Sequence, residues 1–194
     1  TMREGVTNIV ANFTPTLLNL TPGTYSGLFF PSTNDVPRSA GSISFSLSRS
    51  GVYFGRLAPV GANYGIRGQF DANGNSTITD SRGQLFLSLT LFPALDLIGG
   101  IYGDGRSVSS VLLALAPKFG PTNPAPAGNY SFFISQPTDP DAAGGYGYGS
   151  GTAVIDSTGR IKMTGLLGNG TSIRQNTRLL KGNRWPFFAS AGAG

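Results

Sequence analysis

Paired carboxylates are the residues of this sequence that come closest to a catalytic constellation. The chain has nine Asp and Glu residues but no His and no Cys. A Ser-His-Asp triad, a thiol nucleophile, a disulfide framework and the usual Cys/His zinc site are therefore excluded. Two acids about 5 to 10 Å apart in a cleft would support glycoside hydrolysis. Asp139 and Asp141 are the closest pair, but most of the acids fall in predicted turns or loops. We therefore predict a protein that is not an enzyme, with no catalytic residues and no cofactor.

Two loops resemble ion-binding loops in composition. Oxygen-bearing side chains alternate along a tight turn at Asp71, Asn73, Asn75 and Thr77, as they do in calcium loops. An EF-hand needs Gly at its sixth position and Glu at its twelfth, whereas here Gly comes fourth and Arg82 stands twelfth, so a hairpin turn is favoured. Residues 144–151 are rich in glycine, but a strand pattern follows where a phosphate loop needs a helix N-terminus. No metal site is predicted.

Aromatic side chains near the C-terminal end of the chain offer the most plausible ligand-binding surface. Tyr146, Tyr148 and Trp185, with Phe187 and Phe188 nearby, could form a flat platform for the C–H faces of a sugar ring. Packing in a core or between modules is the favoured alternative, because large aromatic rings dominate core energetics. The first three residues remain candidates for binding a polysaccharide.

The basic charge of the chain is spread along the sequence. The net charge is +5, and the fourteen Lys and Arg residues run from Arg3 to Arg184 without a cluster. Nucleic-acid binding usually requires basic clusters with interleaved aromatic residues, so a solvated basic surface is predicted instead. No apolar stretch reaches the 18 to 20 residues of a membrane helix, and no signal segment is visible. The chain is interpreted as a mature product or a piece of a longer precursor.

Hydrophobic periodicity predicts an all-β protein with almost no helix. Charged residues are 12% of a chain that contains 29 Gly and 13 Pro, which is atypical of a helical protein. Apolar side chains alternate with polar ones in residues 42–50, and leucines alternate in residues 84–92, as expected of strands. Further strands are predicted at residues 24–30, 52–58, 62–71, 75–80, 96–102, 108–116, 129–135, 146–156, 160–168, 171–180 and 185–190.

Short turns and one proline-rich stretch predict how these strands are organised. Turns rich in Gly, Asn and Asp connect neighbouring antiparallel strands, and a long meander must close into a barrel or sandwich to hide its edges. The prolines of residues 118–127 cannot lie inside a sheet. We therefore predict an N-terminal strand and linker (residues 1–22), a barrel-like module (23–117), a linker (118–127) and a second, incomplete module (128–194).

The two predicted modules begin alike. The sequence GTYS at residues 23–26 returns as GNYS at residues 128–131, and apolar residues follow in both places. Two related tandem β modules, barrel-like or sandwich-like, are therefore expected. They are unequal, with about eight candidate strands in the first and about five in the second.

The order of these motifs resembles a known module. A G-x-Y-x-G-x-F start at Gly23, G-x-Y/F-x-G-x-L at Gly51, a D-x-x-G turn at Asp156 and a late W-P-F at Trp185 are similar to the paired β modules of very large secreted bacterial proteins. In those proteins the modules follow immunoglobulin-like or bacterial β-repeat domains, and residues 6–13 resemble the closing strand of such a repeat. The resemblance implies an extracellular, multidomain context and no activity.

These observations predict a non-catalytic structural or adhesive module of a secreted or surface protein. An isolated N-terminal strand, with Val6, Ile9, Val10 and Phe13 as its apolar residues, should seek a sheet edge, because its backbone groups are otherwise unpaired. Donation of this strand to the incomplete second module of another copy would give a head-to-tail polymer. The other interpretation is that both ends are places where a larger protein was cut, with neighbouring domains as partners. A carbohydrate-binding module and an outer-membrane β-barrel are the alternative functions.

Overall fold

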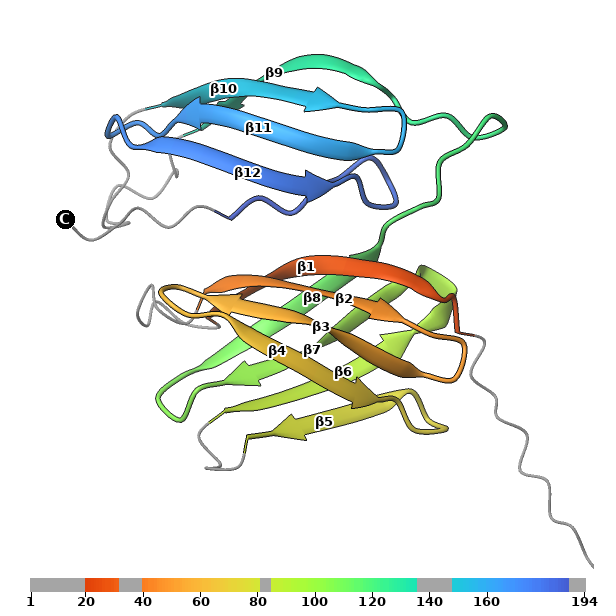
Figure 1. The fold of residues 1–194 in the computed structure, drawn as a ribbon. Coiled ribbons are helices and arrows are strands. Elements are labelled where there is room, and N and C mark those ends of the chain that lie inside the picture. Colours follow the sequence, from red (N-terminus) through yellow and green to blue (C-terminus); the bar gives the residue numbers. More distant parts are fainter. Residues whose placement is uncertain (1–19, 32–39, 81–84, 136–147, 189–194) are drawn as a thin grey trace, which may run out of the picture.

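The computed structural model describes residues 20–31, 40–80, 85–135 and 148–188, which form two antiparallel sheets (Figure 1). The larger sheet contains β1 (Gly23–Pro31), β2 (Gly41–Leu47), β3 (Val52–Pro59), β4 (Tyr64–Gln69), β5 (Asn75–Thr79), β6 (Phe86–Phe92), β7 (Leu97–Gly103) and β8 (Val108–Leu115). The smaller sheet contains β9 (Gly128–Ile134), β10 (Gly149–Ile155), β11 (Arg160–Leu166) and β12 (Ser172–Arg178). The helix found in these ranges is a three-residue 3-10 turn, Pro93–Leu95. The all-β prediction is confirmed.

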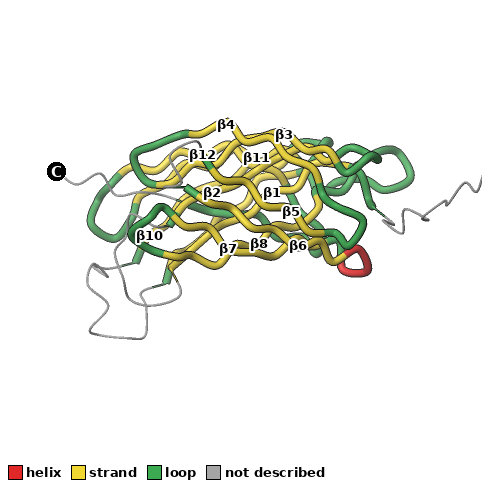
Figure 2. Tube along the Cα trace, turned by 90° about the horizontal axis from the view of Figure 1, so that it is seen from below, coloured by secondary structure: helices red, strands yellow, loops and turns green. Residues whose placement is uncertain are grey.

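The eight-stranded sheet curls into a nearly closed barrel (Figures 1 and 2). Its strand order is β4-β3-β2-β1-β8-β7-β6-β5, so sequential strands are neighbours except at one seam. At that seam β1 pairs with β8, and Tyr25 lies opposite Leu115 while Gly27 lies opposite Leu113. The edge strands β4 and β5 are consecutive in the sequence and meet at the remaining gap. Curling therefore leaves a single short opening in place of two distant sheet edges.

Period-two alternation fills the barrel. Ile43, Phe45 and Leu47 of β2 are buried, while the serines between them lie on the outer face. Leu87, Leu89 and Leu91 of β6 are likewise buried, as the leucine alternation predicts. Inward-facing side chains from all eight strands meet in one hydrophobic cluster, and this core holds the barrel together.

A chain of aromatic rings crosses the core. The ring centroids of Tyr25 and Phe45 are 6.1 Å apart, those of Phe45 and Tyr53 are 4.7 Å apart, and those of Tyr53 and Phe70 are 5.2 Å apart. The Tyr53 hydroxyl lies 2.9 Å from the Ser76 hydroxyl on β5. This buried hydrogen bond satisfies both polar groups. It also links β3 to β5 across the gap between β4 and β5.

The smaller sheet has the order β12-β11-β10-β9 and covers its own cluster of apolar side chains. Ala153, Ile155, Ile161, Met163 and Leu179 are buried there, and Phe119, Phe132, Trp185 and Phe187 pack against them. The second module is thus an open four-stranded sheet rather than a barrel. The two predicted modules are not equal copies of one unit.

The strand predicted at residues 185–190 is wrong for its described part, because residues 185–188 form no strand. Pro186 has no N–H to donate to a ladder, and its carbonyl accepts a hydrogen bond from Gln175 Nε2 at 3.2 Å. The Phe188 N–H in turn donates to Gln175 Oε1 at 3.3 Å. A side chain of β12 therefore takes the place of a partner strand, and this segment lies over the apolar cluster.

The linker predicted at residues 118–127 contains none of the strands β1 to β12. Gly120 and Asn123 within it form an isolated antiparallel bridge. Among the described residues, no helix has the length and apolar character required to span a bilayer.

Candidate functional site

The basic side chains of β11 and β12 converge although they are distant in the sequence. Antiparallel pairing places Arg160 directly opposite Arg178 and Lys162 directly opposite Asn176. Residues two apart on a strand point to the same face, so these four side chains share one face of the sheet. Like charges directly opposite each other destabilise a strand pair. The Arg160–Arg178 pair is therefore a local cost to the fold.

These cations line a cleft of about 510 Å³ between the second sheet and the outer face of β1 and β2. The lining residues are Thr24, Ser26, Gly27, Ser42, Ile43, Ser44, Arg160, Ile161, Lys162, Gln175, Asn176, Thr177, Arg178 and Pro186. Among these described residues there are three cations and neither an acidic nor an aromatic side chain. The cleft is therefore both basic and rich in hydroxyl and amide groups.

A second hollow of about 580 Å³ continues the first, because Thr24 and Arg178 line both. It extends along Thr21, Pro117 and Lys118 toward Thr158. The two hollows thus form one groove between the barrel and the second sheet, with Lys118 as a further cation at its far part.

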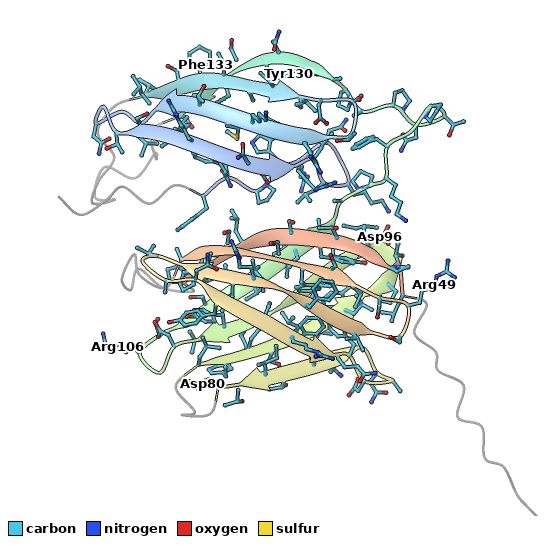
Figure 3. All side chains as sticks on the ribbon, viewed as in Figure 1. Arg49, Asp80, Asp96, Arg106, Tyr130 and Phe133 are labelled. Atoms are coloured by element: carbon cyan, nitrogen blue, oxygen red, sulfur yellow. The ribbon has the colours of Figure 1, made fainter. Side chains whose placement is uncertain are left out.

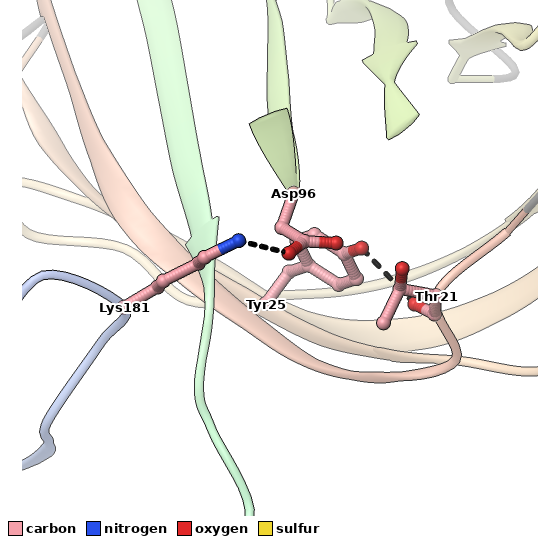
Figure 4. Close-up of polar contacts among 4 residues, drawn as sticks. All are labelled: Thr21, Tyr25, Asp96 and Lys181. Atoms are coloured by element: carbon pink, nitrogen blue, oxygen red, sulfur yellow. Dashed lines mark hydrogen bonds and ion pairs between the residues drawn. The ribbon is translucent and has the colours of Figure 1, made fainter. Parts of the chain in front are cut away.

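An ion pair joins the barrel to the turn after β12 (Figure 4). Lys181 lies in the turn after β12, and its Nζ is 2.6 Å from Asp96 Oδ2. The backbone N–H of Lys181 donates a hydrogen bond to the Leu115 carbonyl at 2.9 Å. The hydrogen bond from Lys181, helped by one from Thr21, lowers the pKa of the Asp96 carboxyl. The neighbouring Tyr25 hydroxyl donates to the Thr21 carbonyl at 3.0 Å. Burial, with a smaller contribution from the charge of Asp96, raises the pKa of Tyr25 to about 12.

We expect Asp96→Asn to lower the free energy of unfolding by about 0.5 to 1 kcal/mol at pH 7, because the Lys181 partner is largely exposed. Asn tolerates the positive φ of 53° at this position. The folded-state pKa of Asp96 is lowered, so its contribution is present above the ordinary carboxyl pKa of about 3.9 and is lost as pH falls through the folded value. Urea unfolding of both proteins at pH 7 and pH 3 should show a smaller difference at pH 3. An equal difference at both pH values would contradict the role of this ion pair.

The predicted sugar platform is only partly within the described residues. Tyr146 lies outside them. Tyr148 is 75% exposed just before β10, whereas Trp185 packs against the apolar cluster of the second sheet. Trp185 therefore packs in a core, as the favoured interpretation expected. The ligand-binding role of these aromatic residues stays a prediction. Asp139 and Asp141, and the N-terminal Val6, Ile9, Val10 and Phe13, also lie outside the described residues.

The loop that resembles a calcium site is a hairpin turn between β4 and β5. Asp71 Oδ1 accepts hydrogen bonds from the N–H groups of Asn73 and Asn75, at 2.9 and 2.8 Å. Gly74 has φ +78°, a conformation that favours glycine. In the described part of the chain, no group of three or more acidic side chains is placed to hold a metal ion.

Within the described ranges, β9 is an edge strand of the second sheet with no partner on its second side, and it lies on the side away from the barrel (Figures 1 and 3). Its sequence, GNYSFFI, has neither a charge nor a proline, and Phe133 is 82% exposed. Charged residues and prolines are the usual protection of an edge strand. The other edge strand, β12, carries Arg174 and Arg178 and borders the groove.

No protein-family model, curated protein or solved structure matches this chain.

Proposed function

We propose that this chain is a non-catalytic structural or adhesive module that associates through the free edge of β9. The observation that carries the proposal is an exposed seven-residue edge strand without a charge or a proline. The unpaired N–H and C=O groups of such an edge hydrogen-bond readily to an added strand. Resemblance to the paired modules of secreted bacterial proteins supports a place in a larger extracellular or surface protein.

A local comparison with β1 supports strand addition at this edge. Both strands begin with Gly-x-Tyr-Ser, and each pairs with the strand that follows it in the chain. In both, the tyrosine hydroxyl donates to the carbonyl four residues earlier: Tyr25 to Thr21 at 3.0 Å and Tyr130 to Pro126 at 2.7 Å. The second side of β1 is occupied by β8. Within the described residues, no strand pairs with the second side of β9.

The proposed occupant is residues 6–13 of a second copy of the chain. This segment, VTNIVANF, is uncharged, and period two would place Ile9 and Phe13 on one face and Val6 and Val10 on the other, so it matches the uncharged, aromatic edge of β9. Because donor and acceptor surfaces are different, each added copy leaves one of each unused. The result is a head-to-tail polymer rather than a closed dimer.

Sedimentation velocity and electron microscopy of the intact chain test this proposal. We expect concentration-dependent assemblies that disappear on deletion of residues 1–13, and also with Ser131→Lys on β9, since a charge on an edge strand opposes strand addition. Thr152→Lys is the matched control, because it adds the same charge opposite Ser131 on the inner strand β10. It should assemble normally.

Two results would overturn strand donation. One is an intact chain that stays monomeric at every concentration, and the other is assembly that persists after deletion of residues 1–13.

A further inference from the structure

We infer that the groove between the barrel and the second sheet binds an anionic polysaccharide, with Arg160, Lys162 and Arg178 holding its carboxylate or sulfate groups. This inference goes beyond the proposed function, because the groove borders β12 and the proposed assembly uses the opposite edge of the sheet.

The positive charge of the cleft is not neutralised by its own lining. The three cations come from two neighbouring strands, and the described lining residues include no carboxylate. The nearby Asp156 lies in the turn before β11 and attracts Arg160. Its Oδ1 already accepts hydrogen bonds from the hydroxyl and N–H of Thr158 and from the N–H of Arg160. Asp96 is likewise paired with Lys181. Asp156 therefore offsets part of the charge of Arg160, whereas no carboxylate lines the cleft beside Lys162 and Arg178.

The arrangement of Arg160 and Arg178 is itself informative. A directly opposed pair of like charges opposes folding of the sheet, and a neutral residue at either position would remove that cost. An anion placed between the two guanidinium groups would convert the repulsion into two charge-assisted contacts. Binding residues commonly cost stability in this way.

The facing wall of the cleft suits sugar hydroxyl groups. Ser26, Ser42 and Ser44 line it from β1 and β2, and Asn176 of β12 adds an amide group on the side of the cations. Hydroxyl and amide groups both donate and accept hydrogen bonds, as do the hydroxyl groups of a sugar. Single-stranded nucleic acid is held in large part by stacking on aromatic side chains. The described lining of the cleft contains none, and Phe119, which lines the second hollow, packs against the apolar cluster of the second sheet. The chemistry of the wall therefore favours an anionic glycan over a nucleic acid.

The length of the groove favours a polymer over a small ion. The cleft, at about 510 Å³, lies within the range of about 300 to 1,000 Å³ that is typical of ligand sites. It continues past Arg178 into the second hollow, where Lys118 adds a cation. A chain with repeated negative charges could contact these cations in succession.

Binding of fluorescently labelled oligosaccharides, followed by anisotropy at protein concentrations where the chain is monomeric, tests the inference. A heparin oligosaccharide supplies sulfate groups, an oligogalacturonate supplies carboxylate groups, and a malto-oligosaccharide is the neutral control. We expect at least one of the anionic probes to bind, with an affinity that falls as salt is added, and the neutral probe not to bind. The double variant Lys162→Gln, Arg178→Gln should weaken binding about tenfold or more, because each change removes charged hydrogen bonds.

A control variant with the same net charge separates a site from general attraction. Arg49 and Arg106 lie on the barrel outside both hollows (Figure 3), so Arg49→Gln, Arg106→Gln should bind nearly as the parent chain does. Equal weakening in both double variants would overturn the inference, as would failure of both anionic probes to bind. Tighter binding of an oligothymidylate of equal charge, with the same dependence on Lys162 and Arg178, would overturn the assignment to a glycan. Thermal unfolding should show that the cleft variant is at least as stable as the parent chain, so weaker binding would not reflect unfolding.

Discussion

Gly27→Ala is expected to lower the free energy of unfolding by about 3 kcal/mol or more, as severe overpacking does. A Cβ at this inward-facing position would lie 1.8 Å from the Leu112 carbonyl oxygen and 2.6 Å from the Leu113 Cα. Both atoms belong to the backbone of β8, so no side-chain rotation can relieve the clash. The β1–β8 seam that closes the barrel must open instead. Urea unfolding followed by circular dichroism measures the loss.

Gly65→Ala is the matched control for this prediction. Gly65 also lies in a barrel strand, β4, but an added Cβ would meet no atom within 4 Å. The free energy of unfolding should therefore change by no more than about 0.5 kcal/mol. Similar losses in the two variants would show that the closeness of β1 and β8 is not what requires glycine at residue 27.

Truncation of Tyr53 to alanine is expected to cost about 3 to 5 kcal/mol, the usual range for a large aromatic ring in a core. Tyr53 is fully buried and its ring packs between those of Phe45 and Phe70. Tyr53→Phe keeps the ring and removes the hydroxyl. It should cost about 1 to 3 kcal/mol, because the buried Ser76 hydroxyl loses its partner.

Ser76→Ala provides the test of the hydrogen bond itself. The double variant Tyr53→Phe, Ser76→Ala removes both polar groups together, so its loss of stability should be clearly smaller than the sum of the two single losses. Denaturant unfolding of the four proteins gives this coupling. Additive losses would mean that the contact between β3 and β5 contributes nothing to the closure of the barrel.

Local pattern was sufficient to predict most strands and the inner face of the barrel. Ile43, Phe45 and Leu47 alternate with serines, and burial follows that alternation because neighbouring side chains of a strand point to opposite faces. The β1–β8 pairing could not be predicted in the same way. It joins strands from the two ends of the barrel sequence, and no turn between them sets their register.

The candidate site was missed for a related reason. Arg160 and Arg178 belong to no basic cluster in the sequence, and the scattered charges predicted only a solvated basic surface. Antiparallel register places the two guanidinium groups opposite each other. The available signal was the two-residue spacing, which places Arg160 and Lys162 on one face of β11, and Arg174, Asn176 and Arg178 on one face of β12. This spacing reveals a basic site only once the pairing of β11 with β12 is known.

The error at residues 185–190 arose because aromatic residues around Pro186 were interpreted as a strand, whereas they cover the apolar cluster.

The seam between β1 and β8 has a consequence for the time course of folding. Sequential hairpins such as β2–β3 and β6–β7 close short loops and form rapidly. By contrast, β1 must wait for β8, the last strand of the barrel, and joining such distant segments carries a large loop-closure entropy. Pairing of distant segments slows folding, so barrel closure should be the rate-limiting event. During synthesis on a ribosome, β1 would stay without its second neighbour until residues 108–115 have emerged.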